Sequence, residues 1–208
     1  MFKALFAFLP VLCAQPASIE ISGGPLPVRI LAQSPADTTA DLQVICLFRS
    51  LPGNALHGSL TEANDKLKGL LDRVRTPELF RGELGETLLI SPPPGSLGAK
   101  KLLIIGLGDS QDFTPMRMQL VGEILYSEST RLGVAEPFFA PTILDGGVNK
   151  FATGEVAEQV IRGFLRAVAI EKAVKGPAVV ARLTFLAGVK NVDSTRSGIE
   201  KAIAPVRK

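Results

Sequence analysis

Two segments of this chain, Asp41–Phe48 and Lys101–Leu107, are apolar at most of their positions. Strands of this kind are typical of parallel sheets that are covered on both faces. Other stretches place apolar residues at helical spacing, the first of them over Leu60–Val74. Strands that alternate with amphipathic helices predict an α/β fold, a three-layer sandwich with a mixed, mostly parallel sheet and helices on both faces.

The remaining elements have weaker patterns of their own. Ser18–Ser22 and Pro27–Gln33 alternate in polarity around a Gly-Gly-Pro turn, which predicts antiparallel strands at one edge of the sheet. Ser59 and Glu62 have the spacing of a capping box at the start of the first helix, which we expect to run unbroken to Thr76. Further strands are expected over Glu86–Ser91, Phe138–Leu144 and Ala181–Ala187, and helices over Thr114–Gly133, Gly154–Lys172 and Ser197–Ile203.

Composition limits the size and the chemistry of the protein. The 208 residues are 46% hydrophobic and 21% charged, enough for one domain with its own core, and residues 18–208 show no linker. Lys and Arg number 23 against 20 Asp and Glu, spread along the chain, and there is no tryptophan and one tyrosine, so no nucleic-acid partner is expected. One histidine and two cysteines exclude a zinc site rich in these residues, and no G-x-S-x-G motif is present.

The first seventeen residues have the pattern of an export signal. A basic start at Lys3 precedes the apolar run Ala4–Ala14, as in secretory signal peptides. This run is shorter than the ~20 residues that cross a bilayer, so no stable membrane insertion is expected after its removal. We therefore predict a signal peptide over residues 1–17, cleaved after Ala14 or Ala17, and an exported protein, periplasmic or extracellular. The alternative is a buried first strand.

Two residues with reactive side chains receive structural interpretations. His57 precedes the first predicted helix and is expected to be a solvated loop residue. Cys46 lies inside an apolar strand, where a cysteine behaves as a small buried hydrophobe, and no base or cation adjoins it in sequence. Neither residue is expected to be catalytic.

Two glycine-containing loops are the candidate ligand sites. One follows the strand Lys101–Leu107 and the other precedes the helix that starts near Gly154; the candidate residues are Gly106, Gly108, Asp109, Gly146 and Gly147. Loops at the carboxyl ends of parallel strands often bind ligands, and their amides can hold a phosphate. The first loop lacks a third glycine at the dinucleotide spacing and has no P-loop lysine, so structural turns are the favoured interpretation and no cofactor is expected.

One stretch of the chain resembles a known family. Phe80–Ile90 reads F-R-G-E-L-G-E-T-L-L-I, and Ala99–Gly108 is a strand that ends in I-G-L-G. This pattern is similar to the "F-x-G-x-x-G-E-T-L-L" and "V-G-L-G" segments of the amino-terminal domain of the leucyl (cytosol) aminopeptidases, peptidase family M17. The resemblance extends over about residues 26–205, and its specific part is residues 80–108.

The resemblance implies a macro-domain-like α/β fold without catalytic residues. In the family a separate carboxy-terminal domain binds two metal ions and contains the motif "N-T-D-A-E-G-R-L", which nothing in this chain matches. No catalytic or metal-binding residue is therefore carried over, and the protein is expected not to be an enzyme. The family is mainly cytoplasmic, so the predicted export signal departs from it.

Three functions remain open at this point. The favoured hypothesis is a non-catalytic, stand-alone homologue of the M17 amino-terminal domain that acts as an interaction or regulatory module, with a protein partner or self-association. The first alternative is a binder of a small molecule, ADP-ribose-like or a nucleotide, although the Asn-rich loop typical of ADP-ribose-binding macro domains is absent. The second alternative is the non-catalytic subunit of a separately encoded metalloaminopeptidase.

Overall fold

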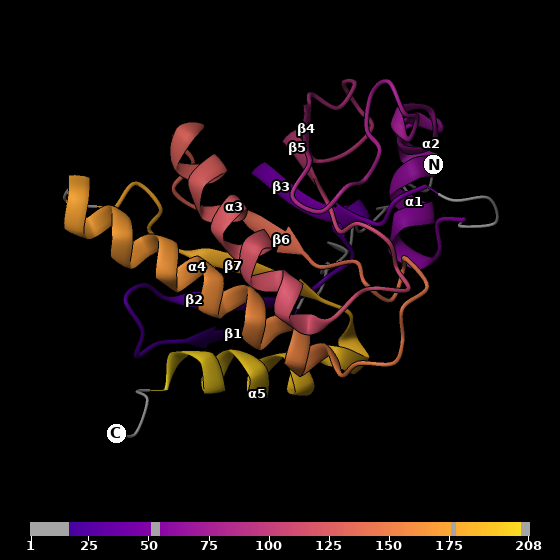
Figure 1. Cartoon of the computed structure of the whole chain (residues 1–208). Helices are drawn as coiled ribbons and strands as arrows, with labels where there is room; N and C mark the ends of the chain where they lie inside the picture. The colour runs from indigo at the N-terminus through magenta and orange to yellow at the C-terminus, as the bar shows by residue number, and fades with distance from the viewer. Residues whose placement is uncertain (1–16, 51–54, 176–177, 205–208) are drawn as a thin grey trace, which may run out of the picture.

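The computed structural model describes residues 17–50, 55–175 and 178–204. Within them one seven-stranded sheet has the strand order β1-β2-β7-β6-β3-β5-β4 (Figure 1). The strands are β1 (Ser18–Ile21), β2 (Val28–Ala32), β3 (Ala40–Leu47), β4 (Thr87–Ile90), β5 (Ala99–Gly106), β6 (Phe138–Ala140) and β7 (Leu183–Ala187). Residues 1–16, which hold nearly all of the predicted signal peptide, lie outside the described residues, and export stays a prediction.

The sheet is mixed, and its centre is parallel. β2, β7, β6, β3 and β5 pair in parallel along the strand order. β1 is antiparallel to β2, as the alternating start of the chain predicts, and β4 is antiparallel to β5 at the opposite edge. The carboxyl ends of the five parallel strands therefore lie at one edge of the sheet.

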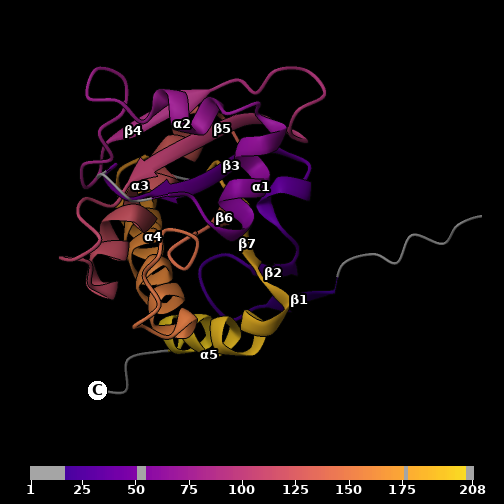
Figure 2. The ribbon, with the colours of Figure 1, turned by 90° about the vertical axis from the view of Figure 1, so that its right-hand side faces the viewer.

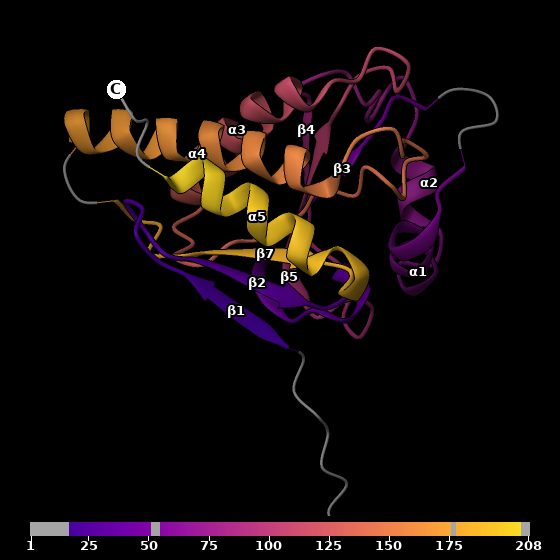
Figure 3. The ribbon, with the colours of Figure 1, turned by 90° about the horizontal axis from the view of Figure 1, so that it is seen from below.

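Helices cover both faces of the sheet. One layer contains α3 (Met118–Arg131), α4 (Thr153–Lys175) and α5 (Val192–Ile203), and the other contains α1 (Gly58–Lys66) and α2 (Leu70–Val74). Figures 2 and 3 show the first layer on the side of the sheet opposite α1. Alternate residues of β3 belong to two hydrophobic clusters, Val44 and Cys46 on the α3–α4 side and Ile45 and Leu47 on the α1–α2 side. The predicted three-layer sandwich is confirmed.

The predicted capping box is wrong, because its two side chains bind elsewhere. The Ser59 hydroxyl donates to Asp145 Oδ2 at 2.5 Å, and Glu62 Oε2 accepts from the Ser34 hydroxyl at 2.9 Å. His57 occupies the N-cap position without a side-chain cap hydrogen bond, and it is exposed, as expected of a loop residue. Partners distant in the sequence have replaced the local cap.

The first predicted helix is two helices. Lys68 and Gly69 have φ angles of 53° and 75°, in the left-handed region, and they separate α1 from α2. The Asn64 side chain makes this break stable, because its Oδ1 accepts from Leu71 N at 3.0 Å at the start of α2. Asn64 Nδ2 also donates to Asp72 Oδ2 at 2.7 Å. An asparagine inside an apparently continuous pattern thus caps a second helix.

Two further boundaries differ from the sequence prediction. β6 ends at Ala140 rather than Leu144, because Thr142 has a φ of 50° and turns the chain out of the sheet. The Thr142 hydroxyl donates to Cys46 O at 2.6 Å and accepts from Cys46 N at 3.0 Å, which fixes the turn at the side of β3. The last helix begins at Val192 rather than Ser197.

Candidate functional site

A cavity of about 370 Å³ lies at the carboxyl ends of β2, β6 and β7. Its walls come from the loops after these strands and from the first turns of α1, α4 and α5. The apolar side chains of Ile143, Phe151, Val156 and Phe185 form much of the lining. In an open α/β sheet, the carboxyl edge of the strands is the place where ligands usually bind.

Polar groups converge on this cavity from several elements. Ser34, Ser59, Glu62, Asp145 and Asn191 line it. Asp145 is half-buried, and its Oδ1 lies so close to Gly58 that a Cβ atom at that position would overlap it. Glu62 is exposed. The cavity is therefore an apolar pocket with a small number of oxygen-bearing side chains, which is the usual composition of a small-molecule site.

The loop Gly106–Ser110, the first sequence candidate, is held by the loop of the resemblance motif. Gly106 N donates to Glu86 O at 2.8 Å, Leu107 N to Leu47 O at 2.9 Å, and Gly108 N to Gly82 O at 2.8 Å. A Cβ atom at Gly106 would overlap the backbone at Glu83. The three amides thus have backbone carbonyl partners, and in this arrangement none of them is offered to an anion.

The glutamate of the motif closes the same structure. Glu86 accepts from Arg81 N at 3.1 Å and from Glu83 N at 3.0 Å, so its carboxylate holds the turn that packs on Gly106. Gly82 has a φ of 79°, and a Cβ atom there would lie 2.8 Å from the Arg49 Cα atom. The glycines and the glutamate of this motif therefore serve close packing of two loops. Asp109, the remaining candidate, accepts from Gln111 N at 2.8 Å in a local turn.

The second candidate loop lies beside the cavity, but its glycines also make turns. Gly146 N donates to Thr142 O at 3.1 Å and Gly147 N to Leu144 O at 3.0 Å. Gly147 has a φ of 85°, which favours glycine. Gly146 packs against the Phe48 ring. Both glycine loops thus flank the end of β3 at one sheet edge, and in the second loop it is Asp145 that lines the cavity.

The cavity residues outside the second loop carry no sequence signal. Ser34, Ser59, Glu62, Asn191 and Thr195 come from segments far apart in the chain and match no motif. Ser59 and Glu62 were visible only as a capping box. Knowledge of the strand order was needed to place these segments around one cavity.

The groups with reactive or metal-binding chemistry lie elsewhere. Cys46 is 1% exposed, and burial raises the pKa of its thiol. His57 does not line the cavity. Among the residues that the structure describes, no three His, Cys, Asp or Glu side chains gather where they could hold a metal ion. Nor does any helix of the described ranges combine the length and apolar character that crossing a membrane requires.

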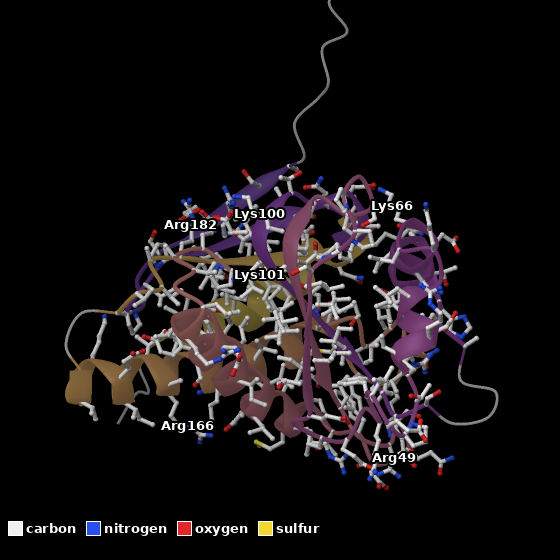
Figure 4. All side chains as sticks on the ribbon, turned by 90° about the horizontal axis from the view of Figure 1, so that it is seen from above. Arg49, Lys66, Lys100, Lys101, Arg166 and Arg182 are labelled. Atoms are coloured by element: carbon white, nitrogen blue, oxygen red, sulfur yellow. The ribbon has the colours of Figure 1, made fainter. Side chains whose placement is uncertain are left out.

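Basic side chains are dispersed over the surface rather than gathered in a stripe. Figure 4 labels six of them, which lie at separate places around the molecule. Most have an acidic partner: Arg49 pairs with Glu83 at 2.6 Å, and Lys100 pairs with Asp41 at 2.7 Å. Lys66, Arg166 and Arg182 pair with Asp37, Glu123 and Glu136. This arrangement offers no continuous positive surface.

Comparison with known proteins gives a family and a fold. The sequence model described as "Cytosol aminopeptidase family, N-terminal domain" matches residues 44–168. No curated protein matches the chain in sequence. Among solved structures, a variant of tomato leucine aminopeptidase superposes with a TM-score of 0.62 at 15% identity, covering 89% of this chain and 37% of that one. This chain therefore spans about a third of the length of that enzyme.

Macrodomains are similar in structure over nearly their whole length. A macrodomain of Oceanobacillus iheyensis with ADP gives a TM-score of 0.59 at 15% identity and covers 91% of this chain and 98% of that one. A macrodomain of Trypanosoma brucei gives 0.59 at 14% identity, with 81% of this chain and 65% of that one covered. At these identities the likeness shows the fold, which is macro-domain-like as the resemblance implies.

Proposed function

Because this chain belongs to the cytosol aminopeptidase family through its N-terminal domain, we propose that it is a non-catalytic regulatory module that binds a small molecule. The observation that carries the proposal is the cavity at the carboxyl ends of β2, β6 and β7. A macrodomain of the same fold was solved with ADP, which supports the use of this fold for binding small molecules. A protein partner that reads the bound state remains a prediction from the sequence.

The proposal of a module without peptidase activity rests on the extent of the family match. The match is to the N-terminal domain, residues 44–168, and about 63% of the tomato enzyme lies outside the part that this chain covers. Hydrolysis with two metal ions needs several ligands that converge on ions about 3.5–4 Å apart. The conserved-looking glycines and Glu86 of this chain are instead used for packing two loops.

The absence of peptidase activity is a testable expectation. The purified protein is expected not to hydrolyse leucine p-nitroanilide when manganese, zinc or cobalt is added, whereas a leucine aminopeptidase assayed beside it does. Release of p-nitroaniline is followed by absorbance. Metal-dependent turnover that copurifies with this protein and is lost when it is unfolded would contradict the proposal.

Binding in the cavity is tested with a neutral aromatic probe, the indole alcohol tryptophol. We expect saturable ¹H–¹⁵N shift changes at cavity amides such as those of Ile143, Val156 and Ala187, because the apolar walls accept a ring of this kind. Gly188 lines the cavity with a φ of −63°, and the nearest atom to an added Cβ is Asn191 Nδ2 at 3.6 Å. The position therefore tolerates a side chain.

Two variants of Gly188 make this test specific. Gly188→Phe is expected to fill the cavity mouth and abolish the tryptophol shifts, while Gly188→Ala leaves them in place. Both variants should fold, as their unliganded spectra will show. Equal tryptophol binding by the two variants, or no saturable change in the unsubstituted protein, counts against the proposed function.

A further inference from the structure

We infer that the ligand of this cavity is an apolar molecule that carries an ammonium group, and that anionic ligands are disfavoured. The inference rests on the proposed function and specifies the ligand class. It follows from the charges of the cavity lining, the partners of the surrounding helix starts, and the apolar character of the walls.

The charged side chains that line the cavity are acidic. Glu62 and Asp145 line it, and none of its lining residues is Lys, Arg or His. Each carboxylate accepts a hydrogen bond from a neutral hydroxyl, Ser34 for Glu62 at 2.9 Å and Ser59 for Asp145 at 2.5 Å. A hydroxyl orients a carboxylate without cancelling its charge, so the cavity keeps a negative potential.

The basic side chains closest in sequence to the lining point to other surroundings. Lys150 is exposed, and its Nζ lies 5.1 Å from the centroid of the Phe151 ring. Lys190 is exposed on the turn before α5. Lys66 of α1 bonds to Asp37 Oδ1 at 2.6 Å and to Ala36 O at 2.9 Å. None of the three lines the cavity or pairs with Glu62 or Asp145 in a bond that these contacts include.

The helix starts around the cavity, which ordinarily attract anions, already have partners. Asp145 places a carboxylate against Gly58 at the start of α1. At the start of α4, Gly154 N donates to the Ser194 hydroxyl at 2.9 Å and Glu155 N donates to Ala152 O at 3.0 Å. The first turn of α5 contains Asp193. A phosphate would therefore meet acidic groups and occupied amides.

The apolar part of the ligand follows from the walls and the size of the cavity. Phe151, Phe185, Ile143 and Val156 surround about 370 Å³, room for one or two fused rings. An ammonium group on a short chain would then reach the carboxylates of Glu62 and Asp145 at the polar side. ADP, which a macrodomain of this fold contains, carries the opposite charge.

Three indole compounds that differ only in the end of their side chain test the inference. They are tryptamine, with an ammonium; tryptophol, with a hydroxyl; and indole-3-propionate, with a carboxylate. At low salt we expect tryptamine to bind roughly fivefold more tightly than tryptophol, and indole-3-propionate to bind more weakly than either. Dissociation constants come from ¹H–¹⁵N titrations, and the preference for tryptamine should shrink as salt is raised.

Matched glutamate variants locate the charge effect. Glu62→Gln is expected to bring the affinity for tryptamine down to that for tryptophol and to leave tryptophol binding unchanged. Glu155→Gln removes an exposed glutamate that does not line the cavity, and it should change neither. An equal loss of tryptamine binding in both variants would show a general surface effect and contradict the inference.

The outcomes separate the inference from the proposed function. If indole-3-propionate or ADP binds as tightly as tryptamine while tryptophol still binds in the cavity, the ligand class is wrong and the binding function stands. If none of the three indole compounds binds, both the inference and the proposed function fail.

Discussion

Replacing Gly163 with alanine is expected to destabilise the protein by about 3 kcal/mol, although alanine ordinarily stabilises a helix relative to glycine by about 1 kcal/mol. Gly163 lies in α4, where α4 crosses α3, and a Cβ atom there would overlap the backbone carbonyl of Gln119. Gly122 of α3 makes the reciprocal contact, with its added Cβ 2.7 Å from Phe164 N. The helices meet backbone to backbone and can accept a side chain only by moving apart.

The matched control is an exposed position of the same helix. Ala169→Gly changes an exposed residue of α4 and should cost about 0.5–1 kcal/mol through helix propensity alone. Free energies of unfolding from urea titrations of the two variants compare the effects. A Gly163→Ala protein that is more stable than the unsubstituted one would show that this face of α4 is open, contrary to the described packing.

The second large effect is expected at the centre of the sheet. Leu103 of β5 is 1% exposed and lies in the core on the α3–α4 side, so Leu103→Asp would bury a carboxylate without a partner. Such a change costs several kcal/mol, a large part of the roughly 5–15 kcal/mol that stabilises a domain. We expect the variant to lose its cooperative thermal transition in near-ultraviolet circular dichroism.

Lys100→Asp, three residues earlier, provides the comparison. The Lys100 side chain is 79% exposed and pairs with Asp41 at 2.7 Å, so its replacement removes a surface ion pair and should lower the melting temperature only slightly. Similar melting temperatures for Lys100→Asp and Leu103→Asp would mean that β5 is not a buried central strand.

The sheet and its order of elements could be predicted because the relevant signals are local. The apolar runs of β3 and β5 and the alternation of β1 and β2 indicate strands covered on two faces or at an edge. The motif at residues 80–108 gave the family, and the structure explains the motif by the contact between Gly82 and Gly108. These features depend on neighbouring residues or on one pair of loops.

The errors have a common physical cause, which is competition from partners far along the chain. The spacing of Ser59 and Glu62 suits a local cap, yet Asp145 binds Ser59 across 86 residues of sequence. The glycine loops were correctly expected at strand ends, but their amides donate to carbonyls that only the folded chain brings close. The cavity was missed for the same reason.

The most direct test of the account is to locate tryptophol in its complex with the protein by intermolecular nuclear Overhauser effects. The account predicts effects between the indole ring protons and the side chains of Phe151, Val156 and Phe185, and their loss in Gly188→Phe but not in Gly188→Ala. Effects confined to exposed apolar side chains such as Met116, with none at the cavity, would contradict a binding site at the carboxyl ends of β2, β6 and β7.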